Sequence, residues 1–269
     1  MSDLLLVRDE NGVRWLTLNR PDRKNSISPD MREEILAALD DARSNEEVRC
    51  VVVTGEGDAF CAGVDLARSG ATKDAAAKKR APDLRAVREA MKAGMQRIVC
   101  AIWDLDKPVI AAVNGTAAGG GAQLALACDL VIAAESARII EIFAKRGLAV
   151  DSGGGWLLPR LIGLAKAKEL VFFGEPISAE DALSIGLVNK VVPDATLADE
   201  ARAWAERLAS GATRAIGASK AMLNRGLGTD LAGFFEEEAS WQALVSQTED
   251  FAEGVRAFME KRAPNFKGR

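Results

Sequence analysis

The chain has 269 residues, of which 48% are hydrophobic and 28% are charged, and its formal net charge is −4 at pH 7. This length and hydrophobic content suit one large α/β domain, or such a domain with a helical appendage, and exclude a disordered chain. The net charge is slightly negative, and the charged residues form no long runs of one sign. This argues against a nucleic-acid-binding protein, since such a protein needs a basic face.

Segments and residues that mark other protein classes are missing from the sequence. No apolar run reaches the roughly 18 residues of a membrane span and no leader opens the chain, so we expect a soluble, cytoplasmic protein without a membrane partner. Cys50, Cys61, Cys100 and Cys128 form no CxxC pair, which favours reduced packing residues over a metal site. Histidine is absent, so a Ser-His-Asp triad is excluded and acid–base chemistry must use carboxylates, lysine, cysteine or water.

The N-terminal half of the chain predicts a hairpin, a helix, a strand and a second helix. Glu10-Asn11-Gly12 lies between two apolar runs, which is typical of a hairpin at a sheet edge. Ser28-Pro29-Asp30 predicts the cap and start of a helix. The expected spans are 4–8 and 13–19 for the hairpin strands, 29–44 for the first helix, 50–54 for a central strand and 84–103 for one long helix.

The expected site is built around the stretch from Lys107 to Leu130. Val109 to Val113 predicts a buried strand, and Ala122 to Cys128 favours a helix. Between them, Gly119-Gly120-Gly121 presents unpaired N–H groups and the positive end of a helix dipole. Such a turn can bind a phosphate or the oxyanion that develops in enolate or acyl chemistry. A purely structural glycine turn is the alternative.

The C-terminal half predicts strands followed mainly by helices. Asp151 precedes Gly153-Gly154-Gly155 among apolar neighbours, so we expect a partly desolvated carboxyl with a raised pKa, suited to proton transfer. Capping the helix that follows is its alternative role. The expected spans are 129–133, 138–142 and 188–192 for strands, and 153–161, 164–173, 179–184, 197–225 and 233–261 for helical segments.

Five motifs, in this order, give the sequence a resemblance to the crotonase, or enoyl-CoA hydratase/isomerase, superfamily. They are Leu18-Asn19-Arg20-Pro21, Phe60-Cys61-Ala62-Gly63-Val64-Asp65-Leu66, the run from Asn114-Gly115 to Gly121, Asp151 to Gly155 with Leu158-Pro159-Arg160, and Glu253-Gly254 to Pro264. Together they are specific and span nearly the whole chain. The resemblance implies a crotonase-like α/β spiral core of repeated ββα units over residues 1–196. It also implies a helical C-terminal region over 197–269 that covers the site and forms a homotrimer or a dimer of trimers.

The resemblance also implies the site and its substrate. The N–H groups of Val64 and Gly120 would together hold the carbonyl oxygen of an acyl-CoA thioester, and Asp151 would be the acid–base group. Arg23 or Lys24 would lie near a phosphate of coenzyme A, which enters as part of the substrate, and no permanently bound cofactor is implied. The other residues expected at the substrate are Ala62, Asp65, Leu66, Gly119 and Gln123.

Two parts of this region have a less specific interpretation. Asp65 is explained more simply as the cap of a following helix than as a catalyst. Residues 67–83 show no clear period, which predicts a loop or frayed helix, and the resemblance implies that this segment shapes acyl specificity.

Departures from the hydratase pattern bear on the reaction. Where hydratases carry two glutamates beside a bound water, this sequence aligns Gln123 and Phe143, and neither side chain exchanges protons near neutral pH. Asp151 alone can move a proton from one carbon to another, which predicts an enoyl-CoA isomerase acting through an enolate. The alternatives are a binding protein without turnover and a hydratase with atypical acids. Glu141 is a second candidate for the acid–base role of Asp151, since it would share a face with Phe143 in a strand. A thioesterase using Cys61 would lack a histidine to activate the thiol.

Overall fold

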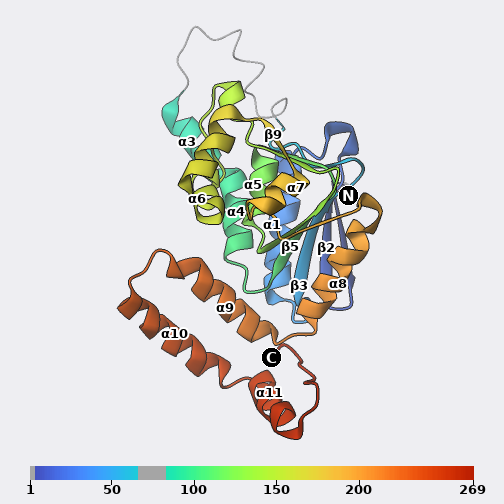
Figure 1. Cartoon of the computed structure of the whole chain (residues 1–269), viewed down its shortest axis with the longest axis vertical. Helices are drawn as coiled ribbons and strands as arrows, with labels where there is room; N and C mark the ends of the chain where they lie inside the picture. The colour runs from blue at the N-terminus through green and yellow to red at the C-terminus, as the bar shows by residue number, and fades with distance from the viewer. Residues whose placement is uncertain (1–3, 66–82) are drawn as a thin grey trace.

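The computed structural model describes residues 4–65 and 83–269, and Figure 1 shows an α/β core with a group of helices beside it. The strands are β1 (Leu5–Glu10), β2 (Val13–Leu18), β3 (Cys50–Gly55), β4 (Ala59–Cys61), β5 (Val109–Val113), β6 (Thr116–Ala118), β7 (Leu130–Ala134), β8 (Arg138–Ile140), β9 (Pro176–Ser178) and β10 (Lys190–Val192). The helices are α1 (Pro29–Ser44), α3 (Leu84–Ala93), α4 (Met95–Trp103), α5 (Gly120–Ala127), α6 (Gly154–Phe173), α7 (Ala179–Ser184), α8 (Leu197–Ala209), α9 (Thr213–Gly226), α10 (Leu231–Val245) and α11 (Glu249–Glu260).

The strands form two sheets that the chain visits alternately. The larger sheet has the order β1-β2-β3-β5-β7-β10, and its pairs are parallel apart from the β1–β2 hairpin. The smaller sheet has the order β4-β6-β8-β9, in which β4, β6 and β8 are parallel. The consecutive pairs β3–β4, β5–β6 and β7–β8 each give one strand to each sheet before the chain turns into helix. The predicted spiral of ββα units is therefore confirmed.

The larger sheet is covered on both faces, which explains the continuous apolar runs in its central strands. All five residues of β5 are buried. Helix α8 packs against β3, β5 and β7, while α5 contacts β5 and β7. Because both faces of a parallel strand must be apolar when helices cover them, such a strand lacks the alternation of a half-exposed one.

Several parts of the fold differ from the sequence prediction. The helical segments expected over 197–225 and 233–261 are each divided into two helices, α8 with α9 and α10 with α11. The single helix expected over 84–103 is wrong, since Gly94, at φ −90° and ψ −135°, leaves the helical region and separates α3 from α4. In the smaller sheet all four strands have three residues, which is too short to show a period, and the sequence prediction includes only β8, as part of the longer strand expected over 138–142.

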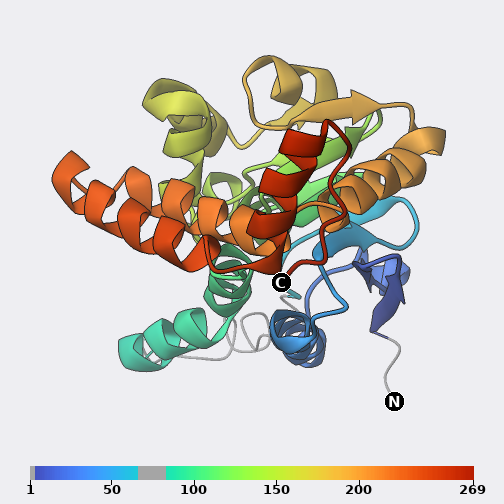
Figure 2. The ribbon, with the colours of Figure 1, turned by 90° about the horizontal axis from the view of Figure 1, so that it is seen from below.

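The C-terminal helices differ in how they relate to the core. Helix α8 packs on the larger sheet, whereas α9, α10 and α11 lie beside one end of the core (Figures 1 and 2). The predicted boundary between residues 196 and 197, and the predicted covering and trimer-forming roles of the helical region, stay predictions. No helix in the described parts of the chain is long and apolar enough to cross a membrane.

An ion pair between the buried Lys220 and the partly exposed Asp129 anchors α9 to the core. The Lys220 ammonium lies 2.9 Å from Asp129 Oδ2 and donates to the carbonyl oxygens of Ile102 and Lys107 at 2.8 and 3.2 Å. Asp129 Oδ2 also accepts the Val109 N–H at 2.7 Å. Removing one partner of a buried pair leaves the other as an uncompensated charge, which is strongly destabilising.

We expect Lys220→Met to lower the free energy of unfolding by roughly 3 kcal/mol, because Asp129 would lose its buried cation. Urea unfolding followed by circular dichroism measures the change. Lys166→Met is the matched control, since the Lys166–Glu169 pair has an N–O distance of 2.7 Å but side chains that are 39% and 54% exposed. The control should lose less than about 1 kcal/mol. Equal losses in both variants would contradict the anchoring role.

Candidate functional site

The centre of the candidate site is a contact between two loops, one after β4 and one between β6 and α5. A Cβ added to Gly121 would overlap the carbonyl oxygen of Cys61, and a Cβ added to Gly63 would lie 2.9 Å from the carbonyl oxygen of Ala118. Gly63 also has a φ of 93°, a conformation that side chains other than glycine rarely adopt. The glycines therefore allow the two backbones to touch.

Two backbone N–H groups emerge where these loops meet. The Ile27–Val64 bridge uses the bonds Ile27 N–H to Gly63 O (2.8 Å) and Asp65 N–H to Ile27 O (3.0 Å), so the Val64 N–H faces away from Ile27. Gly120 is the first residue of α5, and the first N–H groups of a helix have no acceptor within it. Within residues 4–65 and 83–269, neither N–H donates to another protein group. Val64 is 44% exposed, whereas Gly120 is buried.

Asp151 lies half-buried in the turn that leads into α6. Burial raises the pKa of its carboxyl, and the Ser152 hydroxyl, which donates to Oδ1 at 2.7 Å, acts in the opposite direction. The N-cap of α6 is Gly153, and no side chain caps this helix. The alternative role of Asp151 as the cap of α6 is therefore not found.

One face of α4 connects the Asp151 turn to the glycine turn. A Cβ added to Gly120 would lie 3.4 Å from Met95 Cγ, and one added to Gly153 would lie 3.3 Å from Val99 Cγ1. Residues four apart on a helix share a face, with about 5–6 Å between their Cβ atoms. Gly153, two residues after Asp151, therefore contacts α4 at Val99, which is one helical turn from Met95, where Gly120 contacts the same helix.

Gln123 and Phe143, the residues expected where hydratases carry two glutamates, are both buried. The Gln123 amide nitrogen donates to both carboxylate oxygens of Glu141, at 2.9 and 2.7 Å, while Gln123 Oε1 is buried without a hydrogen-bond partner in the described parts. Burial raises the pKa of Glu141 to about 7; the hydrogen bond from Gln123 opposes the rise and the charge of Asp151 adds to it. Glu141, the second candidate acid, is therefore the bound partner of Gln123.

The residues expected near coenzyme A lie at the rim of the first loop. Arg23 and Lys24 are exposed, and so is Ala62. The Ala62 N–H donates to the carbonyl oxygen of Lys24 at 2.9 Å, which places these two residues side by side. Leu66, like residues 67–82 of the expected specificity segment, lies outside the described residues.

Arg20 is a site residue to which the sequence assigns no role, although it belongs to a recognised motif. Its guanidinium donates to Asp65 Oδ2 at 2.8 Å and to the carbonyl oxygen of Ser26 at 2.6 Å. Asp65 is thus an ion-pair partner, and the helix that it would cap falls outside the described residues. Polar residues directly after a buried strand are the one signal in the sequence that points to this contact.

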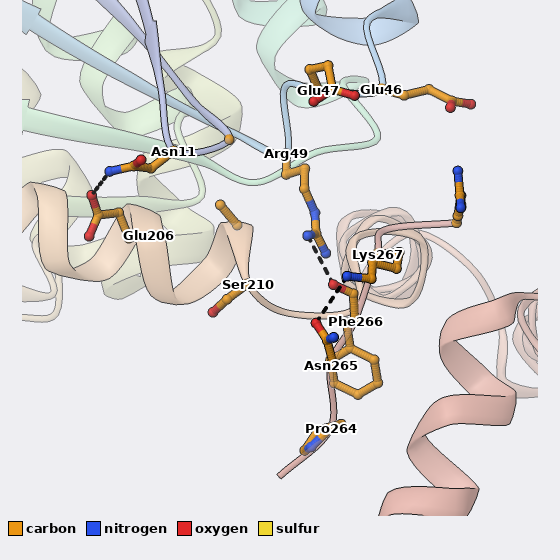
Figure 3. A pocket seen from close by; sticks show the side chains of 13 residues that line it. Asn11, Glu46, Glu47, Arg49, Glu206, Ser210, Pro264, Asn265, Phe266 and Lys267 are labelled. Atoms are coloured by element: carbon orange, nitrogen blue, oxygen red, sulfur yellow. Dashed lines mark hydrogen bonds between the residues drawn. The ribbon is translucent and has the colours of Figure 1, made fainter.

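A cavity of about 710 Å³ lies apart from these residues, between the β1–β2 turn, the end of α8 and the C-terminal segment (Figure 3). None of the expected site residues lines it. Arg49 crosses this region and donates to Thr213 Oγ1 at 2.9 Å and to the carbonyl oxygen of Phe266 at 3.3 Å, so it ties the C-terminal segment to the core. No cluster of acidic or cysteine side chains suited to a metal ion occurs in residues 4–65 and 83–269.

Comparisons with known proteins agree with the motifs and the fold. The family model described as enoyl-CoA hydratase/isomerase matches residues 8–269. The 1,2-epoxyphenylacetyl-CoA isomerase of Escherichia coli is 40% identical over 100% of both chains. A probable enoyl-CoA hydratase of Rhodobacter capsulatus is 43% identical over 96% of this chain and 95% of its own. The crystal structure of a putative enoyl-CoA hydratase from Streptomyces coelicolor superposes with a TM-score of 0.90 at 36% identity, covering 99% of this chain and 94% of the other. The chain therefore belongs to the enoyl-CoA hydratase/isomerase family.

Proposed function

We propose that this protein shifts the double bond of an enoyl-CoA thioester, with Asp151 as the acid–base group and the N–H groups of Val64 and Gly120 as oxyanion donors. The observation that carries the proposal is a half-buried carboxyl of raised pKa two residues before Gly153, which lies against the same face of α4 as Gly120. Family membership supports a coenzyme A thioester as substrate. The name of the E. coli relative supports an isomerase.

The reaction needs one base and one place for negative charge. In a 3-enoyl thioester, Asp151 takes a proton from the α-carbon, and the electron pair of the broken C–H bond moves onto the thioester oxygen to give a dienolate. The N–H groups of Val64 and Gly120 stabilise the resulting enolate. Asp151 then returns the proton two carbons away, and the double bond forms in its new position. Atoms and electrons balance without a cofactor.

The side chains around the two donors favour isomerisation over water addition. Met95 contacts the Gly120 position, and the Phe143 ring lies 3.8 Å from where a Cβ on Gly119 would stand. Both side chains are 5% exposed. The Gln123 amide nitrogen, which could orient a water molecule, is already bound to Glu141. A site with apolar walls and one base suits proton transfer between carbons.

We expect Asp151→Asn to lower isomerisation of a 3-enoyl-CoA thioester by roughly 10² or more, because asparagine keeps the size but cannot exchange protons. Calorimetry of thioester binding should show little change, which separates loss of chemistry from loss of binding. The wild-type rate should fall as the pH drops through the raised pKa of Asp151, since the protonated carboxyl cannot accept a proton. Asp199→Asn, at an exposed position of α8, is the control.

Three outcomes distinguish the candidate roles of the two carboxyls. Full turnover in folded Asp151→Asn protein would remove Asp151 from the mechanism. Loss of turnover in Glu141→Gln alone would give the role to Glu141. Thioester binding by a wild-type protein that turns over no enoyl thioester would support the binding protein instead.

The role of Val64 as an oxyanion donor can be tested by removing its N–H. Proline at this position eliminates the donor without breaking the Ile27 bridge, which uses Gly63 O and the Asp65 N–H. We expect Val64→Pro to lower kcat by about 10² to 10³, the usual cost of losing one oxyanion donor. Val64→Ala keeps the N–H and trims a side chain that is 44% exposed, so its kcat should stay close to that of wild type. Equal kcat values in the two folded variants would argue against a donor at Val64.

Hydration is the second candidate reaction, because the Rhodobacter relative is named a probable hydratase and Glu141 supplies a second carboxyl. We expect the purified protein to hydrate crotonyl-CoA feebly or not at all, since Gln123 and Phe143 replace the two acids beside the water. A spectrophotometric assay of the conjugated thioester measures this rate. Robust hydration that survives Asp151→Asn would overturn the assignment.

The same proposal extends to substrate anchoring and assembly. Lys24 and Arg23, exposed beside Ala62, would lie near a phosphate of coenzyme A. The C-terminal helices expose large apolar side chains, which supports contacts between subunits of a homotrimer or a dimer of trimers. Those most exposed on α9–α11 and the turn between α9 and α10 are Leu223, Leu227, Leu231, Leu244, Phe258 and Met259.

A further inference from the structure

Residues 20–27 form a strap across the loop that carries Val64. The fully buried Asn25 accepts the Arg20 N–H at its Oδ1, at 2.9 Å, and its amide nitrogen donates to the carbonyl oxygens of Glu56 and Ala59 at 2.9 and 2.7 Å. Hydrogen bonds of this kind hold the strap against the connection between β3 and β4. The strap is therefore fixed to the core before it reaches Val64.

The Arg20–Asp65 ion pair closes the strap over the loop. The two side chains are 12% and 9% exposed, and their closest N–O distance is 2.8 Å. The same guanidinium donates to the carbonyl oxygen of Ser26 at 2.6 Å. A charge-assisted hydrogen bond with little water around it is stronger and more directional than an exposed one.

Val64 lies between two residues that the strap holds. The Gly63 carbonyl accepts the Ile27 N–H at 2.8 Å, and the Asp65 N–H donates to the Ile27 carbonyl at 3.0 Å. The side chain of Asp65 is bound by Arg20. In the described parts of the chain the Val64 N–H donates to no protein acceptor, so the bonds of its neighbours set its direction.

We infer that Arg20, through its ion pair with Asp65, is a positioning residue that directs the Val64 N–H at the substrate oxygen. This inference rests on the proposed function. Arg20 touches neither the substrate nor the reacting atoms. Displacing a catalytic group by about 1 Å can cost on the order of 10² in rate, so loss of Arg20 should cost about 10-fold to 10²-fold, less than removal of the donor itself.

Arg20→Met tests the inference, and Arg14→Met is the matched control. Arg14 also pairs with two carboxylates, Asp9 at 2.7 Å and Asp41 at 2.6 Å, and its side chain is 6% exposed, but it lies on β2 away from Val64. We expect both variants to lower Tm. Arg20→Met should lower kcat by about 10-fold to 10²-fold with KM nearly unchanged, while Arg14→Met keeps the wild-type kcat. If Arg20→Met folds poorly, Asp65→Asn is the second variant and should change kcat in the same direction.

A second readout does not depend on turnover. Acetoacetyl-CoA forms an enolate that absorbs in the ultraviolet, and two correctly placed N–H donors should increase its enolate fraction when it is bound. We expect wild-type protein and Arg14→Met to raise this absorbance at saturating ligand, and Arg20→Met to raise it less. An equal rise with Arg20→Met, or a kcat loss shared by Arg14→Met, overturns the positioning role. If wild-type protein binds the ligand without raising the absorbance, the proposal that Val64 and Gly120 are oxyanion donors is wrong. The inference about Arg20 is then wrong as well.

Discussion

The close approach of two backbones at Gly63 and Gly121 is the constraint on which the rest of the site depends. Strands β4 and β6 pair in parallel through Ala59–Thr116 and Cys61–Ala117, so the chain leaves both strands in the same direction at the spacing of one ladder. With a side chain at Gly121, the second loop would overlap the Cys61 carbonyl. A Cβ on Gly63 would also lie 3.2 Å from the Gly120 nitrogen, so the residue before Val64 lies against the start of α5. The two proposed donors would therefore depend on this backbone contact.

The larger sheet could be predicted from the sequence because its strands carry a strong signal. Both faces of β3 and β5 are buried, so each strand is a continuous apolar run bounded by turn residues. In the smaller sheet β4, β6 and β9 have no such signal, and only the apolar segment around β8 was predicted as a strand. The break at Gly94 is also hidden, because the apolar period continues on both sides and a single glycine is tolerated in many helices.

The candidate site was predictable only in part, because some of its hydrogen-bonded partners are far apart in the sequence. Val64, Gly120 and Asp151 belong to motifs, so the resemblance identifies them. The partner of Gln123 lies 18 positions away and the partner of Arg20 lies 45 positions away. A local pattern contains no information about such pairs. The sequence could name Glu141 as a candidate acid but could not show that its carboxyl is bound by the Gln123 amide.

The residue type at position 123 determines whether Glu141 can be accommodated beside it. A glutamate at position 123 would bring a second carboxyl to within the 2.7–2.9 Å now spanned by hydrogen bonds from the amide. Two buried carboxylates at such a separation cannot both ionise, so one of them would have to keep a proton. The amide avoids this conflict because its nitrogen donates. Since the pKa of Glu141 is raised to about 7, Glu141 mostly carries its proton below that pH. One charged base suits a reaction that takes and returns a single proton, whereas adding water across a double bond requires two groups acting on one water molecule.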